Sequence, residues 1–200
     1  GAGVTLVHHD GANSPVTVVN DILFGIGSSF IPNPNSNVNI GSVVRKVEVK
    51  DDNWHLISSP VGTEEYDDAW VTANGIASGG GNKRGISTYD NGTPDSTTGP
   101  WRYYQAGATA TTFGAGVGYA LKATDAAGDI YEFTGTHQAG TISSAITQDA
   151  TNYSLVGNPY NAYIDVAAFI TENTAKLPAS AQTIYVWDAA NATYTGLTSG

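Results

Sequence analysis

The stretch Trp54-His55-Leu56-Ile57-Ser58-Ser59-Pro60 recurs 99 residues later as Tyr153-Ser154-Leu155-Val156-Gly157-Asn158-Pro159. Both copies share an aromatic residue, a leucine, a β-branched residue and a closing proline, which predicts a short buried strand that ends at a proline turn. Further matches hold the same offset or lose one residue: Gly41 with Gly140, Asn53 with Asn152, Trp70-Val71-Thr72 with Phe169-Ile170-Thr171, and Ile86 and Tyr89-Asp90 with Ile184 and Trp187-Asp188. This agreement in register indicates an internal duplication.

The duplication divides the chain into three parts. Residues 1–40 are expected to supply N-terminal strands and a loop, residues 41–139 form the first repeat, and residues 140–200 form a second repeat that is incomplete at its C-terminus. The second repeat has no counterpart of residues 105–139, and a half-sheet without its closing strands has unpaired edges, which proteins avoid. Three alternatives stay open: completion by residues 1–40, completion by another copy or a following domain, or an origin as an excerpt of a longer protein.

Short alternating runs punctuated by glycine and proline indicate the fold class. They predict an all-β protein, mainly an antiparallel β-sandwich, built from two internally repeated halves with one short helix each. The first helix is expected from Glu64 to Val71, with acidic residues in the first turn, where the helix dipole favours them. The second is expected from Ile164 to Leu177, ended by Pro178, with Ile164, Ala167, Ala168 and Phe169 near one face.

Composition excludes several classes of function. The net charge is −10, which disfavours nucleic acid and anionic lipid as partners. No run approaches the roughly 20 apolar residues of a membrane helix, so no membrane insertion is expected. Cysteine is absent from the sequence, which rules out disulfides and thiolate chemistry. Only 13% of residues are charged and 24 are glycine, which is typical of secreted β proteins.

Several blocks in a fixed order resemble a known region of exported proteins. The blocks run from Asn53 to Val61, Gly81 to Tyr89, Gly116 to Tyr119, Phe133 to Gly135, Leu155 to Tyr160 and Tyr185 to Asp188. Together they resemble a β-rich region of secreted and cell-surface proteins of the Bacteroidetes, Flavobacteria especially, found upstream of the sorting domain of type IX secretion. The resemblance covers roughly residues 40–200 and implies an extracellular, non-catalytic role in large surface proteins, such as adhesins and modular polysaccharide-handling enzymes. The chain lacks the Pro-Gly-x-Gly-Phe-Phe-like strand with which that region usually continues.

Aromatic residues are the first candidates for binding. Three of the four tryptophans, Trp54, Trp70 and Trp187, have an aromatic counterpart in the other copy, which predicts core positions. The exception is the stretch with Trp101, Tyr103 and Tyr104, which follows a loop and is a candidate platform for stacking on sugar rings.

Acidic turns are candidates for calcium, because Ca²⁺ prefers hard oxygen ligands. The residues considered are Asp90 and Asp95 in one turn and Asp125 and Asp129 in another, with turn capping as the competing interpretation. The acids at Glu64, Glu65, Asp67 and Asp68 lack the spacing of a calcium loop. The pair His8-His9 is a poor chelator because adjacent strand residues point to opposite faces. No cofactor is expected otherwise.

One modification site and no catalytic site emerge. Asp95-Ser96-Thr97 resembles the O-glycosylation sites of exported Bacteroidetes proteins, with Ser96 as acceptor. No Gly-x-Ser-x-Gly elbow and no phosphate-binding loop are present, so we expect no enzyme.

The sequence therefore predicts a structural or adhesive module at a bacterial cell surface, with other copies of itself or neighbouring domains as partners. Such a module can assemble into a filament if the unfinished repeat accepts a strand from another chain. The alternative is a carbohydrate-binding module of a secreted polysaccharide-degrading enzyme, with glycans as partners.

Overall fold

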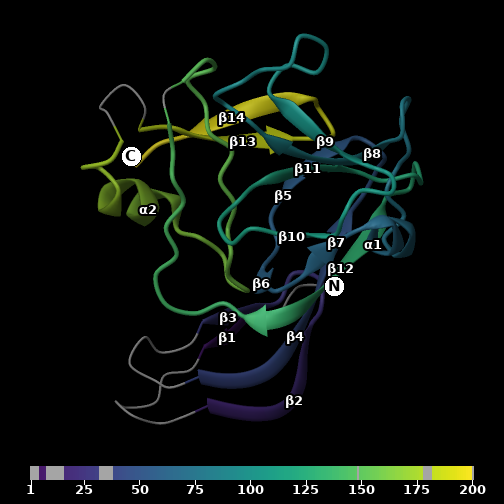
Figure 1. Cartoon of the computed structure of the whole chain (residues 1–200). Coiled ribbons are helices and arrows are strands. Elements are labelled where there is room, and N and C mark those ends of the chain that lie inside the picture. Colours follow the sequence, from purple (N-terminus) through teal and green to yellow (C-terminus); the bar gives the residue numbers. More distant parts are fainter. Residues whose placement is uncertain (1–4, 8–15, 32–37, 148, 178–181, 200) are drawn as a thin grey trace. The chain divides into compact units, whose positions relative to one another are not determined.

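A computed structural model describes residues 5–7, 16–31, 38–147, 149–177 and 182–199 (Figure 1). The chain divides into two compact units, Gly1–Ala162 and Tyr163–Gly200. Strands dominate the first unit, and the second holds a two-stranded sheet and one short helix, so the predicted all-β class is confirmed.

The first of two four-stranded sheets is antiparallel throughout. Its strands, in spatial order, are β5 (Trp54–Ile57), β11 (Tyr119–Lys122), β8 (Lys83–Tyr89) and β9 (Trp101–Gln105). Strand β11 lies in the middle and pairs with β5 on one side and β8 on the other. One face of this sheet carries Ile86, Tyr119 and Leu121, all buried.

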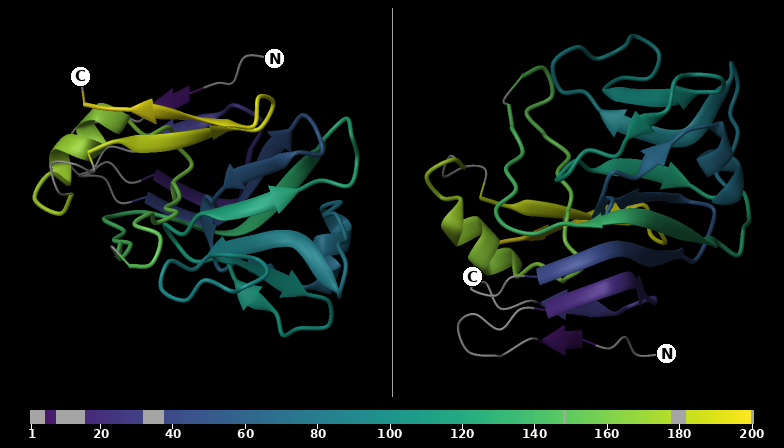
Figure 2. Two further views of the ribbon diagram at one scale, coloured as in Figure 1. Left: turned by 90° about the horizontal axis from the view of Figure 1, so that it is seen from above. Right: turned by 60° about the horizontal axis from the view of Figure 1, so that its bottom comes forward.

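The second four-stranded sheet is mixed. Its spatial order is β2 (Val16–Phe24), β4 (Val38–Val49), β12 (Asp129–His137) and β6 (Val61–Gly62). Strand β2 runs parallel to β4, and Figure 2 shows these two strands beside β12. Strand β12 alternates between buried and exposed residues, with Tyr131 and Phe133 inward, as expected for a strand with one solvated face. The described part of residues 1–40 thus contributes an edge strand to a sheet of its own chain.

Two smaller ladders complete the first unit. Strand β1 (Thr5–Val7) pairs in parallel with β3 (Ser29–Ile31), and β7 (Glu65–Tyr66) pairs in antiparallel with β10 (Thr111–Thr112).

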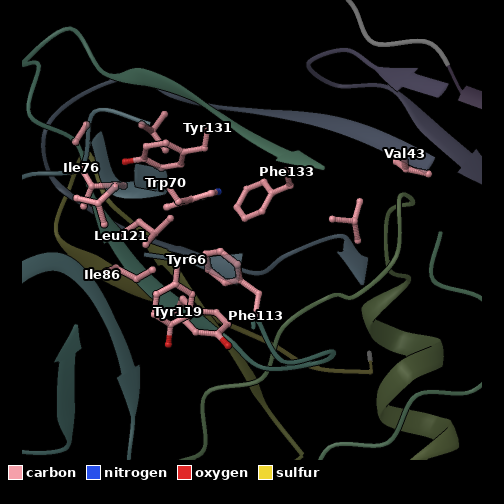
Figure 3. Close-up of a cluster of buried hydrophobic side chains, with 14 of the residues drawn as sticks. Val43, Tyr66, Trp70, Ile76, Ile86, Phe113, Tyr119, Leu121, Tyr131 and Phe133 are labelled. Atoms are coloured by element: carbon pink, nitrogen blue, oxygen red, sulfur yellow. The ribbon is translucent and has the colours of Figure 1, made fainter. Parts of the chain in front are cut away.

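One aromatic cluster joins the buried faces of the two large sheets. Figure 3 shows Phe113 among Tyr66, Trp70, Tyr119 and Phe133, with ring centroids 4.7, 5.1, 4.9 and 5.3 Å from its own. Tilted and edge-to-face geometries of this kind add to the burial of apolar area. The core therefore depends on loop residues as well as on strands, since Phe113 lies in the segment between β10 and β11.

The first predicted helix is present as α1 (Asp68–Ala73), but its predicted start at Glu64 is wrong, because Glu65 and Tyr66 form strand β7. The carboxylate of Asp67 accepts the Trp70 N–H at 2.8 Å and so caps the N-terminus. Trp70 and Val71 are buried, which confirms a core position for Trp70. The prediction for Trp54 is wrong: the four residues of β5 are all half-buried, and the Trp54 ring contacts Tyr103.

The unit Tyr163–Gly200 holds a helix and a hairpin. These are α2 (Val166–Glu172), β13 (Ile184–Asp188) and β14 (Thr193–Leu197). The predicted end at Leu177 is wrong, because Asn173 caps the helix by donating its side-chain amide to the Phe169 carbonyl at 2.8 Å. The predicted inward face is also wrong: Ala167 and Ala168 are exposed, and Ile170 is the buried residue of the helix.

Matching caps recur in the two predicted repeats. Asn74 donates to the Trp70 carbonyl at 3.0 Å, as Asn173 does to Phe169. After the following strand, Asp90 accepts the Gly92 N–H at 2.9 Å, and Asp188 accepts the Ala190 N–H at 3.0 Å. The duplication remains an inference from the sequence, and these shared local contacts agree with it.

The two copies of the opening stretch differ in structure. The first forms β5, whereas the second makes a single bridge, from Val156 to Val117, so the strand predicted there is wrong. Strand β5 already pairs with β11, so the second copy does not extend that ladder. It contacts the end of the first copy, where the Ser58 hydroxyl donates to the Asn158 carbonyl at 2.7 Å, and the residues before β11, where the Gly157 N–H donates to the Gly116 carbonyl at 2.9 Å.

Candidate functional site

Strand β9 places two of the three predicted platform residues on one face. Alternation along a strand puts Trp101 and Tyr103 on the same side and Tyr104 on the other. Tyr104 is 7% exposed, its ring packs edge-on against Tyr66 at 5.6 Å, and its hydroxyl donates to the Ala108 carbonyl at 3.1 Å. The prediction that Tyr104 belongs to an exposed platform is therefore wrong, and it is a core residue.

Trp101 and Tyr103 are half-buried and fixed by neighbouring rings. Trp101 lies edge-on against Tyr89, 5.1 Å between centroids, and Tyr103 lies edge-on against Trp54 at 5.8 Å. These contacts hold both rings without covering them completely. Ser87 of β8 pairs with Tyr103 and is 2% exposed, so a small side chain lies beside the tyrosine.

An open groove of about 390 Å³ runs along these two rings. Polar side chains complete its lining, among them Lys83, Asp95, Thr98 and Arg102. The groove thus combines two aromatic rings with charged and hydroxyl groups, the composition of sites that bind small polar ligands. We call it the β9 groove, meaning the groove lined by these four residues together with Trp101 and Tyr103.

The loop of residues 90–100, which contributes to the β9 groove, is held by two aspartates that were candidates for calcium. Asp90 accepts hydrogen bonds from Gly92 N–H and from the Thr93 N–H and hydroxyl, and forms an ion pair with Arg102 at 3.2 Å. The Thr93 hydrogen bonds, with help from Arg102, lower the pKa of Asp90 to about 2. Its carboxylate is therefore used inside the loop.

Asp95 closes the turn at the tip of this loop. Its Oδ1 accepts the N–H groups of Thr97 and Thr98 at 2.8 and 2.9 Å, and these bonds lower the pKa of Asp95. Ser96 is exposed in this turn, so the predicted acceptor of a glycan is accessible, and its modification remains a prediction.

The remaining acids make similar local contacts. Asp125 accepts the Ala127 N–H at 2.8 Å, and Asp129 accepts its neighbour Ile130 N–H at 2.7 Å. Among the described residues, no three His, Asp or Glu side chains come together as metal ligands. The four aspartates predicted for calcium thus accept backbone N–H groups nearby in the chain, and calcium binding stays a prediction. The stretch His8-His9-Asp10 lies outside the described residues.

The acidic segment at the start of α1 is also structural. Glu64 accepts the Thr134 N–H at 2.7 Å, and burial raises its pKa. Asp68 accepts the Gly107 N–H at 2.8 Å, which ties α1 to the turn after β9.

Lys83 and Arg102 are the functional candidates that sequence reasoning missed. Lys83 pairs with Gln105 across the β8–β9 hairpin, and its ammonium nitrogen lies 5.5 Å from the centroid of the Tyr103 ring. Pairing of the two strands creates this contact, and the only signal in the sequence was the basic pair Lys83-Arg84 within a glycine-rich block.

Comparisons with known proteins give one match. A family model described as a domain of unknown function, DUF8693, matches residues 17–199. The searches of curated proteins and of solved structures returned no match. In the part of the chain that the structure describes, neither helix is long and apolar enough to cross a membrane.

Proposed function

The chain belongs to the DUF8693 family, and we propose from its geometry that it is a non-catalytic, extracellular adhesive module that binds carbohydrate in the β9 groove. The observation that carries the proposal is the pair Trp101 and Tyr103, which share one face beside hydrogen-bonding side chains in an open groove.

The chemistry of a sugar ring matches this arrangement. A pyranose has an apolar C–H face, which packs on an aromatic ring, and a rim of hydroxyl groups, which needs donors and acceptors. Trp101 and Tyr103 offer the rings. Thr98 and Gln105 at the edge of the same groove donate to the Trp101 and Tyr103 carbonyls at 2.9 and 3.1 Å, and their side-chain oxygens can accept hydrogen bonds from sugar hydroxyls. An open groove suits a chain of sugars better than a single buried one.

The extracellular setting is part of the proposal. It is supported by the low charged fraction of 13%, the high glycine content and the resemblance to exported Bacteroidetes surface proteins. Adhesion through a glycan would be the natural use of such a groove on a cell surface.

The test measures binding to a panel of oligosaccharides and polysaccharides by affinity electrophoresis and calorimetry. We expect Trp101→Ala and Tyr103→Ala to weaken binding at least about tenfold, the usual effect of removing an aromatic anchor. Tyr153→Ala is the matched control, because Tyr153 is 62% exposed outside the groove. The proposal fails if no glycan binds, or if the control weakens binding as much as the groove variants.

A second candidate function is assembly by strand exchange, and one observation in the unit Tyr163–Gly200 favours it. Its hairpin β13–β14 is a two-stranded sheet, whereas the matching strand β8 lies between β9 and β11. Tyr185, Val186 and Tyr194 of the hairpin are 54%, 47% and 52% exposed. Two-stranded hairpins are marginally stable in water, and addition of a strand from another copy is a common remedy.

Light scattering and electron microscopy of the purified chain test this second candidate. Concentration-dependent oligomers or filaments are expected, and Val186→Lys is expected to reduce them because a charge on a strand opposes edge pairing. A monodisperse monomer at all concentrations would contradict the candidate and leave the glycan proposal intact.

A further inference from the structure

We propose that the β9 groove selects an acidic glycan, one that carries carboxylate or sulfate groups, and that the ammonium group of Lys83 binds the negatively charged group. The inference rests on the proposed function, because it names the class of carbohydrate for the same groove.

Two cations in one groove are notable in this chain. Lysine and arginine number only 8 against 18 acids, yet Lys83 and Arg102 both line the β9 groove. A cation on a strongly acidic protein faces a general negative potential, so it raises local affinity for anions only if its own charge is not neutralised nearby.

Arg102 is neutralised by contacts within the protein. Its guanidinium forms an ion pair with Asp90 at 3.2 Å and donates to the Gly99 carbonyl at 3.0 Å. A further contact joins it to the Thr93 hydroxyl at 3.4 Å. Arg102 therefore stabilises the loop of residues 90–100, and its charge is largely neutralised before a ligand binds.

Lys83 differs from Arg102 in this respect. None of the carboxylates that the structure describes lies within ion-pair distance of its ammonium group, which instead lies over the Tyr103 ring at 5.5 Å. A cation–π contact orients the ammonium group and leaves its positive charge in place. The charge consequently lies over one of the two rings that line the groove, so an acidic substituent of a bound sugar can reach it.

Asp95 sets the position of the acidic group. It also lines the groove, and its hydrogen bonds to the Thr97 and Thr98 N–H groups keep it ionised. A carboxylate repels a ligand anion and accepts hydrogen bonds from sugar hydroxyls. The expected orientation therefore places the acidic group of the glycan at Lys83 and hydroxyl groups at Asp95.

The experiment compares three oligosaccharides of equal length by calorimetry: an oligouronide, a sulfated oligosaccharide and a neutral one. The acidic ligands are expected to bind more tightly than the neutral one, and their binding is expected to weaken with salt. Lys83→Gln should lower affinity for the acidic ligand about tenfold, in line with the loss of a charge-assisted hydrogen bond, and lower affinity for the neutral ligand by a smaller factor. Comparison of the affinities for the oligouronide and the sulfated oligosaccharide identifies which anionic group is preferred.

Lys50→Gln is the matched control, because Lys50 is exposed and lies outside the groove lining. Equal effects of the two lysine variants would overturn the role of Lys83. Equal or tighter binding of the neutral ligand would overturn the acidic-glycan inference while the proposed function stands. If the folded wild-type protein bound none of the three ligands, both the acidic-glycan inference and the proposed function would be overturned.

Discussion

Replacing Phe113 by alanine tests the central packing argument. The side chain is 2% exposed and lies between the two four-stranded sheets, with four aromatic rings around it: Tyr66, Trp70, Tyr119 and Phe133. These rings come from β7, α1, β11 and β12. Removing Phe113 therefore opens a cavity at the point where elements of both sheets meet.

The size of the effect follows from the contacts. Truncation of a buried phenylalanine lowers the free energy of unfolding by about 3–5 kcal/mol, of which part is lost transfer energy and part is the unfilled cavity. Rigid rings on four sides relax poorly into a cavity, so we expect the upper part of this range. Because a domain of this kind is stable by about 5–15 kcal/mol, the variant should unfold at a much lower urea concentration.

The assay is urea unfolding followed by tryptophan fluorescence, to which Trp70 at 5.1 Å from Phe113 contributes. Thr112→Ala is the control, since Thr112 is the exposed neighbour and its change should stay within about 0.5 kcal/mol. Phe113→Leu should fall between the two. A loss below about 1 kcal/mol for Phe113→Ala would refute the placement of this ring at the centre of the core.

Three further predictions concern close packing and pH. Gly157→Ala should lower the free energy of unfolding by about 1–3 kcal/mol in urea, because the new Cβ would lie 2.4 Å from the Ser58 Cβ and 2.5 Å from the Val117 carbonyl oxygen; unchanged stability would contradict the close approach of the two copies. The pKa of Asp90 is lowered from 3.8 to about 2, so the ionised carboxylate stabilises the folded state fully above pH 3.8, and this stabilisation is lost as the pH falls toward 2. Asp90→Asn should reduce the dependence of the free energy of unfolding on pH in that range. Burial lowers the pKa of His137 below 6.5, so the folded state binds fewer protons than the unfolded state and stability should fall as the pH drops below 6.5; a ring titration by NMR with a midpoint at or above 6.5 would refute this.

Local patterns in the sequence predicted the fold class and the presence of a helix at Trp70, although not where that helix begins. Alternation in β12 is visible because its sheet has one buried face, and the acids before Trp70 mark the start of α1. The role of Phe113 was not predictable, because a single aromatic residue before Gly114 is typical of a turn. The ring is buried only by its contacts with residues far away in the sequence, such as Phe133. Which side chains of β5 face the core was equally unpredictable, since a four-residue strand fits either orientation until it pairs with β11.

The candidate site was predictable in part. The stretch with Trp101, Tyr103 and Tyr104 stood out because each of the other three tryptophans has an aromatic counterpart in the other copy. Alternation along β9 was sufficient to separate Tyr103 from Tyr104, but which of the two faces the core depends on the partner sheet. Lys83 reaches the groove only through its pairing with Gln105, across an irregular register between Lys83 and Ser87, and such irregularities have no clear mark in a single sequence.

Residue size differs between the two predicted copies at the strand position opposite Tyr103. In β8, Ser87 lies opposite Tyr103 and pairs on its other side with Ala120, so two small, buried residues lie beside the tyrosine. The predicted counterpart of Ser87 is Tyr185, which lies opposite Gly196 in the hairpin β13–β14. A Cβ at Gly196 would come within 3.5 Å of the Tyr185 ring, so the large and the small residue have exchanged strands. A duplicated scaffold with the same caps and turns thus carries different side chains at corresponding positions of its two hairpins, with Tyr103 in the first copy and Gly196 in the second.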